Sequence, residues 1–305
     1  MSRLRLIYVL GVGRSGSTLL DLLLGRRRGV VGVGEFTNVT EWLRTGQLCS
    51  CGEPVASCEM WSEVRRGVAA DTAAESVSFG SGKTGTLHAI FRALLSGKSF
   101  PAYADVAGLN RAYLDRVREV TDAEVVVDSS KDIRRACVLA ASDLFDIRFL
   151  HLVRDPRGVM WSRLKTKRNS TDPRDGSKQA RSCSATMRRW VGVNLVSLAF
   201  GVTRWRGRYC VVRYEDLATD PEATLRRVAT WADLPVGEAA ASTPHLIAGN
   251  LVKMRPIADI RLDDEWRRSL GWRGRVAYVA HGGPIVAALV ARVARAGPPR
   301  LAVSD

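Results

Sequence analysis

Short continuous runs of apolar residues recur along the chain and alternate with stretches that have the periodicity of amphipathic helices. The apolar runs predict buried strands over residues 4–10, 30–33, 124–128, 147–153 and 209–214. Helices are predicted from about residues 18, 133, 156 and 221, and further helical stretches near 84–97, 106–121 and 178–205. Apolar strands that alternate with helices are typical of a parallel sheet covered on both faces. The pattern therefore predicts an α/β protein, and without a linker or repeat we expect one domain over residues 1–305.

The charge balance is strongly basic. The 305 residues include 46 Lys and Arg against 31 Asp and Glu, a formal net charge of +15. Such an excess attracts nucleic acid, anionic membrane or a multiply phosphorylated small molecule, although runs such as residues 26–28 also fit a solvated surface. A nucleic-acid-binding protein would need clustered basic residues with exposed aromatic side chains or a recognised binding module. Neither is evident, so we expect no nucleic-acid partner.

The hydropathy profile argues against a membrane protein. The first apolar stretch resembles a signal peptide, but Arg14 ends it after nine residues and no small-residue cleavage site follows. The longest apolar segment near the carboxyl terminus, residues 276–294, is interrupted by a His-Gly-Gly-Pro run at 281–284 and by Arg292. We therefore expect no membrane span and a soluble, cytoplasmic protein.

Three of the six cysteines lie close together as C-x-C-x6-C, at Cys49, Cys51 and Cys58. A structural zinc site needs four ligands, usually as two close pairs, and the sequence shows no second pair. The spacing alone leaves open whether these thiols form a disulfide or bind a metal. The expectation is a stabilised loop without a metal site.

A glycine-rich turn follows the first predicted strand and precedes a helix. In this context the backbone N–H groups of the turn and of the helix start face an anion, and glycine lets the anion approach closely. A turn that only packs the helix on the sheet is the alternative. The predicted phosphate-binding residues are Gly11, Gly13, Arg14, Ser15, Gly16, Ser17 and Thr18.

The turn lacks one residue that nucleoside triphosphatases require. Their loop, G-x-x-x-x-G-K-[ST], uses the lysine on the β- and γ-phosphates, and here Ser17 takes its place. Arg14 supplies a cation inside the loop instead. A similar run at residues 80–84 lacks the first glycine and a preceding strand. A kinase or nucleoside triphosphatase therefore remains only the alternative function.

A second anion site is predicted where the strand over residues 147–153 ends. Arg154 follows that strand, and Asp155-Pro156 begins a helix whose first N–H groups have no partner within the helix. A guanidinium with the hydroxyl of Ser162 suits a terminal phosphate. The alternative is a structural pair between Arg154 and Asp155 that caps the helix.

Three motifs together resemble the sulfotransferases that use 3′-phosphoadenosine-5′-phosphosulfate (PAPS), of the bacterial type. Residues 11–20 match G-x-x-[RK]-S-G-[ST]-T-[LW]-L, Arg154 and Ser162 match the Arg–Ser pair of LVRDPRGVMWS, and residues 214–221 match Y-E-D-L-x-x-x-P. The motifs span about three quarters of the chain. The resemblance implies a P-loop NTPase-like three-layer fold with a central parallel β-sheet. It also implies PAPS as donor and 3′,5′-ADP as product, without a required metal. A small-molecule, sugar or peptidyl hydroxyl is the expected acceptor. The resemblance is also compatible with a homodimer.

The resemblance also suggests catalytic residues. Glu35 follows the strand over residues 30–33 and lies 21 residues beyond Arg14, a spacing similar to that in tyrosylprotein sulfotransferases, so Glu35 is the candidate general base. A glutamate at a helix start is the alternative. Many cytosolic relatives use a histidine, which none of the four histidines here matches. Lys131 corresponds to a lysine that contacts the bridging or sulfuryl oxygens in relatives, and Arg14 is assigned to the departing phosphate. Asp128 is expected to have a structural role.

Further residues are assigned to the adenosine half of the donor. Tyr214 is expected there, together with Lys253 and Arg255 of a late basic loop that lacks the family's R-K-G form. The acceptor pocket is expected within residues 38–120 and 165–200. Most of the five tryptophans with helical spacings are expected in the core rather than in that pocket: Trp61, Trp190, Trp205, Trp266 and Trp272.

Overall fold

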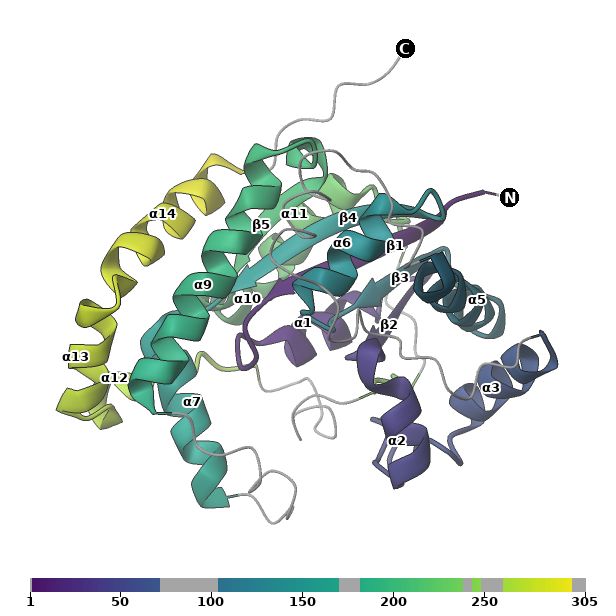
Figure 1. Ribbon diagram of the computed structural model, residues 1–305, viewed down its shortest axis with the longest axis horizontal. Helices are drawn as coiled ribbons and strands as arrows, with labels where there is room; N and C mark the ends of the chain where they lie inside the picture. The colour runs from purple at the N-terminus through teal and green to yellow at the C-terminus, as the bar shows by residue number, and fades with distance from the viewer. Residues whose placement is uncertain (1, 72–103, 170–181, 238–242, 248–259, 298–305) are drawn as a thin grey trace.

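The computed structural model describes residues 2–71, 104–169, 182–237, 243–247 and 260–297. These residues form a five-stranded sheet in the order β2-β3-β1-β4-β5, and each pair of neighbouring strands is parallel (Figure 1). The strands are β1 Leu4–Gly11, β2 Val30–Gly34, β3 Val125–Asp128, β4 Phe145–Val153 and β5 Tyr209–Arg213. The predicted α/β class is confirmed, and the carboxyl ends of all five strands lie at one edge of the sheet.

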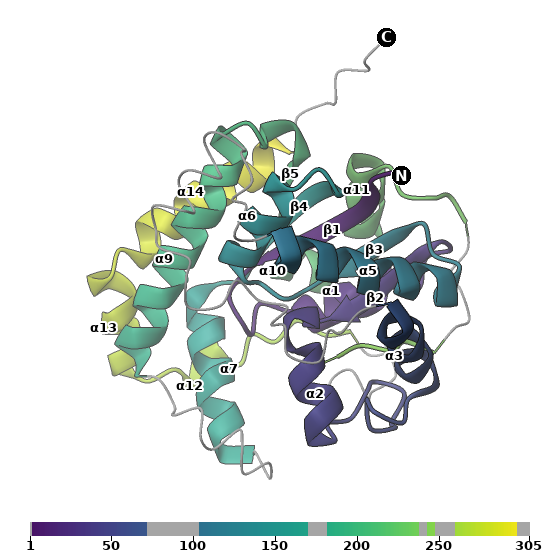
Figure 2. The ribbon, with the colours of Figure 1, turned by 45° about the vertical axis from the view of Figure 1, so that its right-hand side comes forward.

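The central strand explains why the sheet is covered on both faces. In β1, Leu4, Leu6, Tyr8 and Leu10 pack into one hydrophobic cluster, whereas Ile7 and Val9 pack into the other. This is the alternation of a strand whose two faces are both buried. On the first face lie α5 (Ala104–Thr121), α6 (Ile133–Ala141) and α9 (Cys183–Val202). On the second face lie α1 (Ser17–Leu24) and α11 (Pro221–Ala232) (Figures 1 and 2).

Further helices surround these layers. They are α2 (Val39–Thr45), α3 (Glu59–Asp71), α7 (Pro156–Asn169), α10 (Tyr214–Thr219), α12 (Trp266–Ser269), α13 (Trp272–Ala280) and α14 (Gly283–Ala296), with short 3₁₀ turns η1 (Phe36–Asn38) and η5 (Arg206–Arg208). In both views α13 and α14, in yellow, lie outside α9, and both contact it. The last helices of the described chain therefore cover α7 and α9, and α14 also packs against β5 at the edge of the sheet.

The predicted elements differ from the structure in a few places. The helix predicted from residue 156 continues to Asn169, and Tyr214 begins α10 instead of ending β5. The predicted helix at 84–97, the run at 80–84 and residues 170–178 lie outside the described residues. Four of the five tryptophans are buried as expected, but Trp272, the first residue of α13, is 69% exposed.

The apolar carboxyl-terminal segment forms two helices. Within the described ranges, the structure contains no single helix with the length and apolar composition of a membrane span. The pair α13 and α14 meets these two criteria only when taken together, and a bend of 69° separates the two helices. The bend falls in the His-Gly-Gly-Pro run that interrupts the apolar pattern.

Candidate active site

The glycine-rich turn connects β1 to α1 and is tightly enclosed. Gly11 has a φ of 135°, and a Cβ atom there would lie 2.4 Å from the carbonyl oxygen of Leu152. Gly16 has a φ of 90°, and its Cβ would lie 2.5 Å from the ring of Tyr214. Only glycine tolerates both the positive φ and the close neighbour. The turn is therefore fitted between the end of β4 and the start of α10.

Within the turn, hydrogen-bonding groups are left available for a ligand. Ser15 is 1% exposed, yet its Oγ has no hydrogen-bond partner among the described residues. Gly16 precedes α1 in a left-handed conformation and provides no side-chain cap for the first N–H groups of the helix. Arg14 also has a positive φ, of 77°, and Thr18 lies in the first turn of α1. Together with Gly13, these residues form the kind of helix-start cradle that binds anions.

Ser17, Glu35 and Lys131, which follow β1, β2 and β3 respectively, meet at this turn. The Lys131 Nζ donates hydrogen bonds to Ser17 Oγ at 3.0 Å and to Glu35 Oε1 at 3.0 Å. It also donates to the carbonyl oxygen of Ser129 at 2.5 Å. The Lys131 side chain is 9% exposed, whereas that of Glu35 is 31% exposed. The ammonium group is therefore enclosed, and the carboxylate remains accessible to a substrate.

The backbone of Glu35 is held by a segment distant in sequence. Its N–H donates to the carbonyl oxygen of Ile247 at 2.8 Å, and the N–H of Ile247 donates to Val33 at 3.1 Å. Between them, Gly34 has a φ of 73° and approaches Ile247 so closely that a Cβ would clash. This short parallel bridge between Gly34 and Ile247 could not be predicted, because nothing near residue 247 has the sequence pattern of a strand.

A buried ion pair supports the loop that carries Lys131. Arg135 Nη1 lies 2.7 Å from Asp128 Oδ2, and both side chains are fully buried. The other Asp128 oxygen accepts from the Ser130 N–H at 2.9 Å, and Asn110 Oδ1 accepts two bonds from Arg135. The geometry agrees with the structural role expected for Asp128. The pairing of Arg135 with Asp128 could not be predicted, because the sequence pattern around Arg135 is that of an ordinary helix.

A second buried carboxyl group lies under the turn. Asp21, on α1, accepts a hydrogen bond from Ser129 Oγ at 2.5 Å and is fully buried. Burial raises the pKa of Asp21 to about 7, although the Ser129 hydrogen bond opposes this shift. Asp21 thereby links the helix after the turn to the loop after β3, a contact that the sequence analysis did not predict.

The predicted second anion site is close to the first. Arg154 Nη1 donates to the carbonyl oxygen of Arg14 at 3.3 Å, and its guanidinium lies 4.3 Å from the centre of the Tyr214 ring. However, Arg154 Nη2 also forms an ion pair with Asp263 Oδ2 at 3.0 Å. A phosphate that binds Arg154 must therefore share it with Asp263 or displace that carboxylate. Ser162 is partly buried on α7.

The alternative interpretation, a cap formed by Arg154 and Asp155, is not what the structure shows. Asp155 instead pairs with Arg157, at 2.7 Å, and accepts a hydrogen bond from its backbone N–H. The N–H of Asp155 donates to Glu215 Oε1 at 2.9 Å. The Tyr-Glu-Asp motif therefore connects α10 to the start of α7, and its glutamate has a structural contact.

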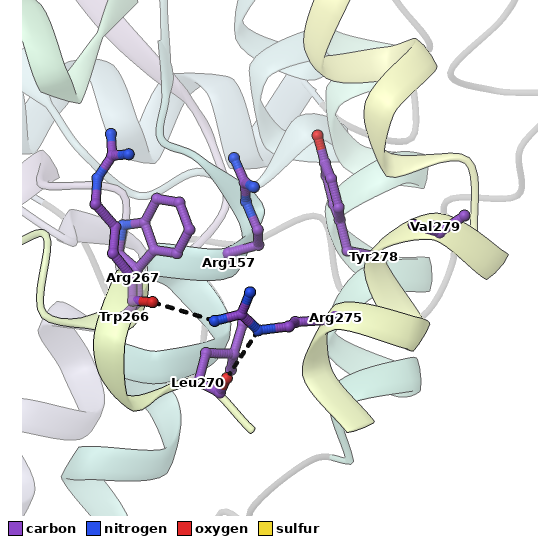
Figure 3. A pocket seen from close by; sticks show the side chains of 7 residues that line it. All are labelled: Arg157, Trp266, Arg267, Leu270, Arg275, Tyr278 and Val279. Carbon is purple, nitrogen blue, oxygen red and sulfur yellow. Dashed lines mark hydrogen bonds between the residues drawn. The ribbon is translucent and has the colours of Figure 1, made fainter. Parts of the chain in front are cut away.

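A pocket of about 430 Å³ opens beside α7 (Figure 3). In it, the Arg157 guanidinium lies 4.3 Å from the ring centre of Trp266 and 4.7 Å from that of Tyr278. None of the predicted site residues that the structure describes lines this pocket. Its residues are Arg157, Trp266, Arg267, Leu270, Arg275, Tyr278 and Val279. The pocket is basic and depends on α12 and α13, which the sequence analysis did not assign.

The described part of the site thus brings Gly11–Thr18, Glu35, Lys131, Arg154 and Tyr214 to one edge of the sheet. Lys253 and Arg255 lie outside the described residues. Comparison with known families decides the class of protein: residues 7–238 match the family model described as "Sulfotransferase family". The chain belongs to the sulfotransferase family. The matched range includes every predicted site residue except the two in the late basic loop.

Individual relatives are distant. Carbohydrate sulfotransferase 1 of Danio rerio is 28% identical over 144 residues, which cover 43% of this chain and 30% of the relative. The chain thus matches about a third of that protein's length. The sulfotransferase domain of the curacin biosynthetic pathway aligns over 92% of this chain and 98% of its own, at 18% identity and a TM-score of 0.51. The sulfotransferase domain of the Synechococcus PCC 7002 olefin synthase has 19% identity, with 92% and 95% coverage and a TM-score of 0.47. The curacin-pathway domain supports the sulfotransferase fold with its parallel sheet.

Proposed function

We propose that the protein transfers a sulfuryl group from PAPS to the hydroxyl group of an acceptor and releases 3′,5′-ADP. Membership of the sulfotransferase family supports the class of reaction. The observation that carries the proposal is the position of Lys131, whose Nζ lies 3.0 Å from both Ser17 Oγ and Glu35 Oε1. One cation thereby joins the start of the anion-binding helix to an accessible carboxylate.

The residues of the turn fit the phosphosulfate end of the donor. Gly11 and Gly16 let the turn pack directly against Leu152 and Tyr214, and the buried Ser15 hydroxyl has no partner among the described residues. Backbone N–H groups at a helix start bind phosphate oxygens without any metal. We therefore assign the 5′-phosphosulfate to Gly11, Gly13, Arg14, Ser15, Gly16, Ser17 and Thr18.

The 3′-phosphate is assigned to Arg154 and Ser162. Arg154 lies against the carbonyl oxygen of Arg14, so the two anion sites are adjacent, as the two ends of one nucleotide require. Tyr214, whose ring lies close to both Gly16 and the Arg154 guanidinium, is assigned to the nucleoside in the proposal. Lys253 and Arg255 complete this half of the donor site in the proposal, on the basis of the family resemblance.

PAPS supplies an activated sulfuryl group whose leaving group is a phosphate. Transfer of this kind resembles phosphoryl transfer, in which catalysis consists mainly of positioning and of neutralising charge. Arg14 and Lys131 neutralise the charge that develops on the departing phosphate and the sulfuryl oxygens. Glu35 accepts the proton of the acceptor hydroxyl, because a carboxylate that binds Lys131 through Oε1 retains lone pairs for a second partner. The proposal needs no metal for the transfer.

The acceptor is assigned only by class. The 31% exposure of Glu35 leaves its carboxylate within reach of a hydroxyl from outside. A sugar hydroxyl is the first class to test, because the curated relative is named a carbohydrate sulfotransferase. Small phenols and tyrosine-containing peptides are the other two classes.

The experiment is transfer of labelled sulfur from PAPS to representatives of these classes, followed by mass spectrometry of the products. Glu35→Gln is expected to reduce kcat by about 100-fold or more, the usual contribution of a general base, with little change in affinity for 3′,5′-ADP. Glu41→Gln, an acidic residue on α2, is the matched control and should retain activity. Turnover by Glu35→Gln at the normal rate would remove Glu35 as the base. Magnesium-dependent ATP turnover, without sulfur transfer, would favour a kinase instead.

A further inference from the structure

The three clustered cysteines meet a fourth metal-binding side chain that comes from the far end of the chain. Cys49, Cys51 and Cys58 lie between α2 and α3, and His245 lies in the segment 243–247. The three sulfur atoms and the Nδ1 or Nε2 nitrogen of His245 all lie within 4.8 Å of one another. The sequence showed the three thiols but not this histidine, which is 187 residues beyond Cys58.

The distances fit tetrahedral coordination. Bonds of about 2.3 Å to sulfur and 2.0 Å to nitrogen place tetrahedral ligands about 3.8 Å apart for two sulfurs and about 3.5 Å apart for sulfur and nitrogen. Cys51 Sγ and Cys58 Sγ are 3.7 Å apart. His245 Nδ1 lies 3.2 Å from Cys58 Sγ and 3.9 Å from Cys49 Sγ. All three thiols are free rather than joined as a disulfide.

Backbone hydrogen bonds hold the cysteine loop in this arrangement. The Cys49 N–H donates to Glu53 at 2.8 Å, and the Cys58 N–H donates to Pro54 at 2.8 Å. Cys49 and Cys58 are fully buried, while Cys51 is partly exposed. The loop therefore directs its three sulfur atoms toward one point.

Separate contacts hold the histidine segment against that loop. The Ser50 N–H donates to the carbonyl oxygen of Leu246 at 3.3 Å, and the Leu246 N–H donates to Ser50 Oγ at 2.7 Å. The indole N–H of Trp61 donates to the carbonyl oxygen of His245 at 2.9 Å. Since the main chain on both sides is fixed, the imidazole is positioned over the three thiols.

We propose that Cys49, Cys51, Cys58 and His245 bind one zinc ion as a structural site. Three thiolates and one imidazole form a ligand set that zinc prefers over magnesium or calcium. Four protein ligands fill a tetrahedral shell and leave no position for substrate, which separates this site from a catalytic one. Binding releases the protons of the thiols that ionise. The inference does not depend on the reaction proposed above.

The site has a mechanical connection to Glu35. Two residues after His245, Ile247 accepts the Glu35 N–H and donates to Val33. Zinc would therefore hold in place the segment 243–247, which is hydrogen-bonded to the end of β2 next to Glu35. If the proposed function holds, loss of zinc should lower turnover through Glu35 while leaving the Gly11–Thr18 turn and its affinity for 3′,5′-ADP largely unchanged.

The test measures the metal content of the full-length protein by inductively coupled plasma mass spectrometry. The protein is purified under reducing conditions from zinc-supplemented cells. About one zinc per chain is expected. Cys51→Ser and His245→Ala are each expected to weaken zinc affinity at least tenfold, measured by competition with a coloured chelator. Cys183→Ser is the matched control, because Cys183 is also partly exposed but lies on α9. It should retain zinc as the unmodified protein does.

A second measurement needs no variant. Replacement of the metal by Co²⁺ in the unmodified protein should produce the visible absorption of a tetrahedral cobalt–thiolate site, and a strong chelator should lower the Tm. Failure of the reduced protein to bind either Zn²⁺ or Co²⁺ would overturn the proposal. So would normal zinc content in both ligand variants, or a Cys51–Cys58 disulfide in protein alkylated before purification.

Discussion

The ion pair between Arg135 and Asp128 allows a quantitative prediction about stability. Replacement of Arg135 by Met leaves the Asp128 carboxylate fully buried without its cation, and removes both hydrogen bonds that Asn110 Oδ1 accepts. Loss of one partner of a buried pair costs about 3–5 kcal/mol. A protein of this kind has a total free energy of unfolding of about 5–15 kcal/mol. Arg135→Met should therefore lower the free energy of unfolding by about 4 kcal/mol, which is a large part of the total.

Urea unfolding followed by tryptophan fluorescence measures this loss. The neighbouring Arg134 is the control: its side chain is 43% exposed and lies 3.8 Å from Asp132 Oδ1, so Arg134→Met should cost about 0–1 kcal/mol. Adding Asp128→Asn to Arg135→Met removes the unpaired charge and should recover at least half of the loss. If Arg135→Met and Arg134→Met cost the same, or if the second substitution recovers nothing, the reasoning from buried charge is wrong.

Two further predictions concern the turn and the helix that follows it. Gly16→Ala forces a Cβ to within 2.5 Å of the Tyr214 ring at a φ of 90°, so 3′,5′-ADP affinity measured by calorimetry should fall at least tenfold. Gly46→Ala, at a φ of 64° with no atom within 4 Å, should leave that affinity unchanged, and equal affinities in both variants would contradict the steric argument. Burial raises the pKa of Asp21 to about 7, so the folded protein retains a proton that the unfolded chain loses above about pH 4. The contribution of Asp21 to stability therefore falls as the pH rises from about 4 to 7. Asp21→Asn should lack this fall and gain up to about 4 kcal/mol relative to the unmodified protein between pH 4 and pH 8, whereas parallel urea-unfolding profiles would refute the assignment.

The sequence pattern was informative where strands end. Glu35 and Lys131 each follow an apolar run, and parallel strands bring their carboxyl ends to one edge, so their proximity to Ser17 followed from the predicted sheet. Arg154 also follows a predicted strand, and the structure brings it beside the turn. Local patterns and one rule of topology account for the positions of these residues, whereas their assigned roles rest on the family resemblance.

Contacts across long separations in sequence were not predictable in this way. Asp263 pairs with Arg154 from a segment that has no strand or helix pattern, and His245 approaches the cysteines from a segment of five described residues. Burial also decides what sequence does not show: Arg135 and Arg134 are adjacent and chemically identical, yet only Arg135 lies in the core. Such distinctions depend on the packing of helices from several parts of the chain.

The central claim, that the site binds the PAPS nucleotide, is tested most directly by calorimetric titration with 3′,5′-ADP, which requires no knowledge of the acceptor. The account predicts saturable binding with one site per chain, no dependence on magnesium, and affinity at least tenfold higher than for 5′-AMP, which lacks the phosphate assigned to Arg154. In Arg154→Ala the two nucleotides should bind equally weakly. Absence of 3′,5′-ADP binding to the unmodified protein, or tighter binding of ATP with magnesium, would contradict it.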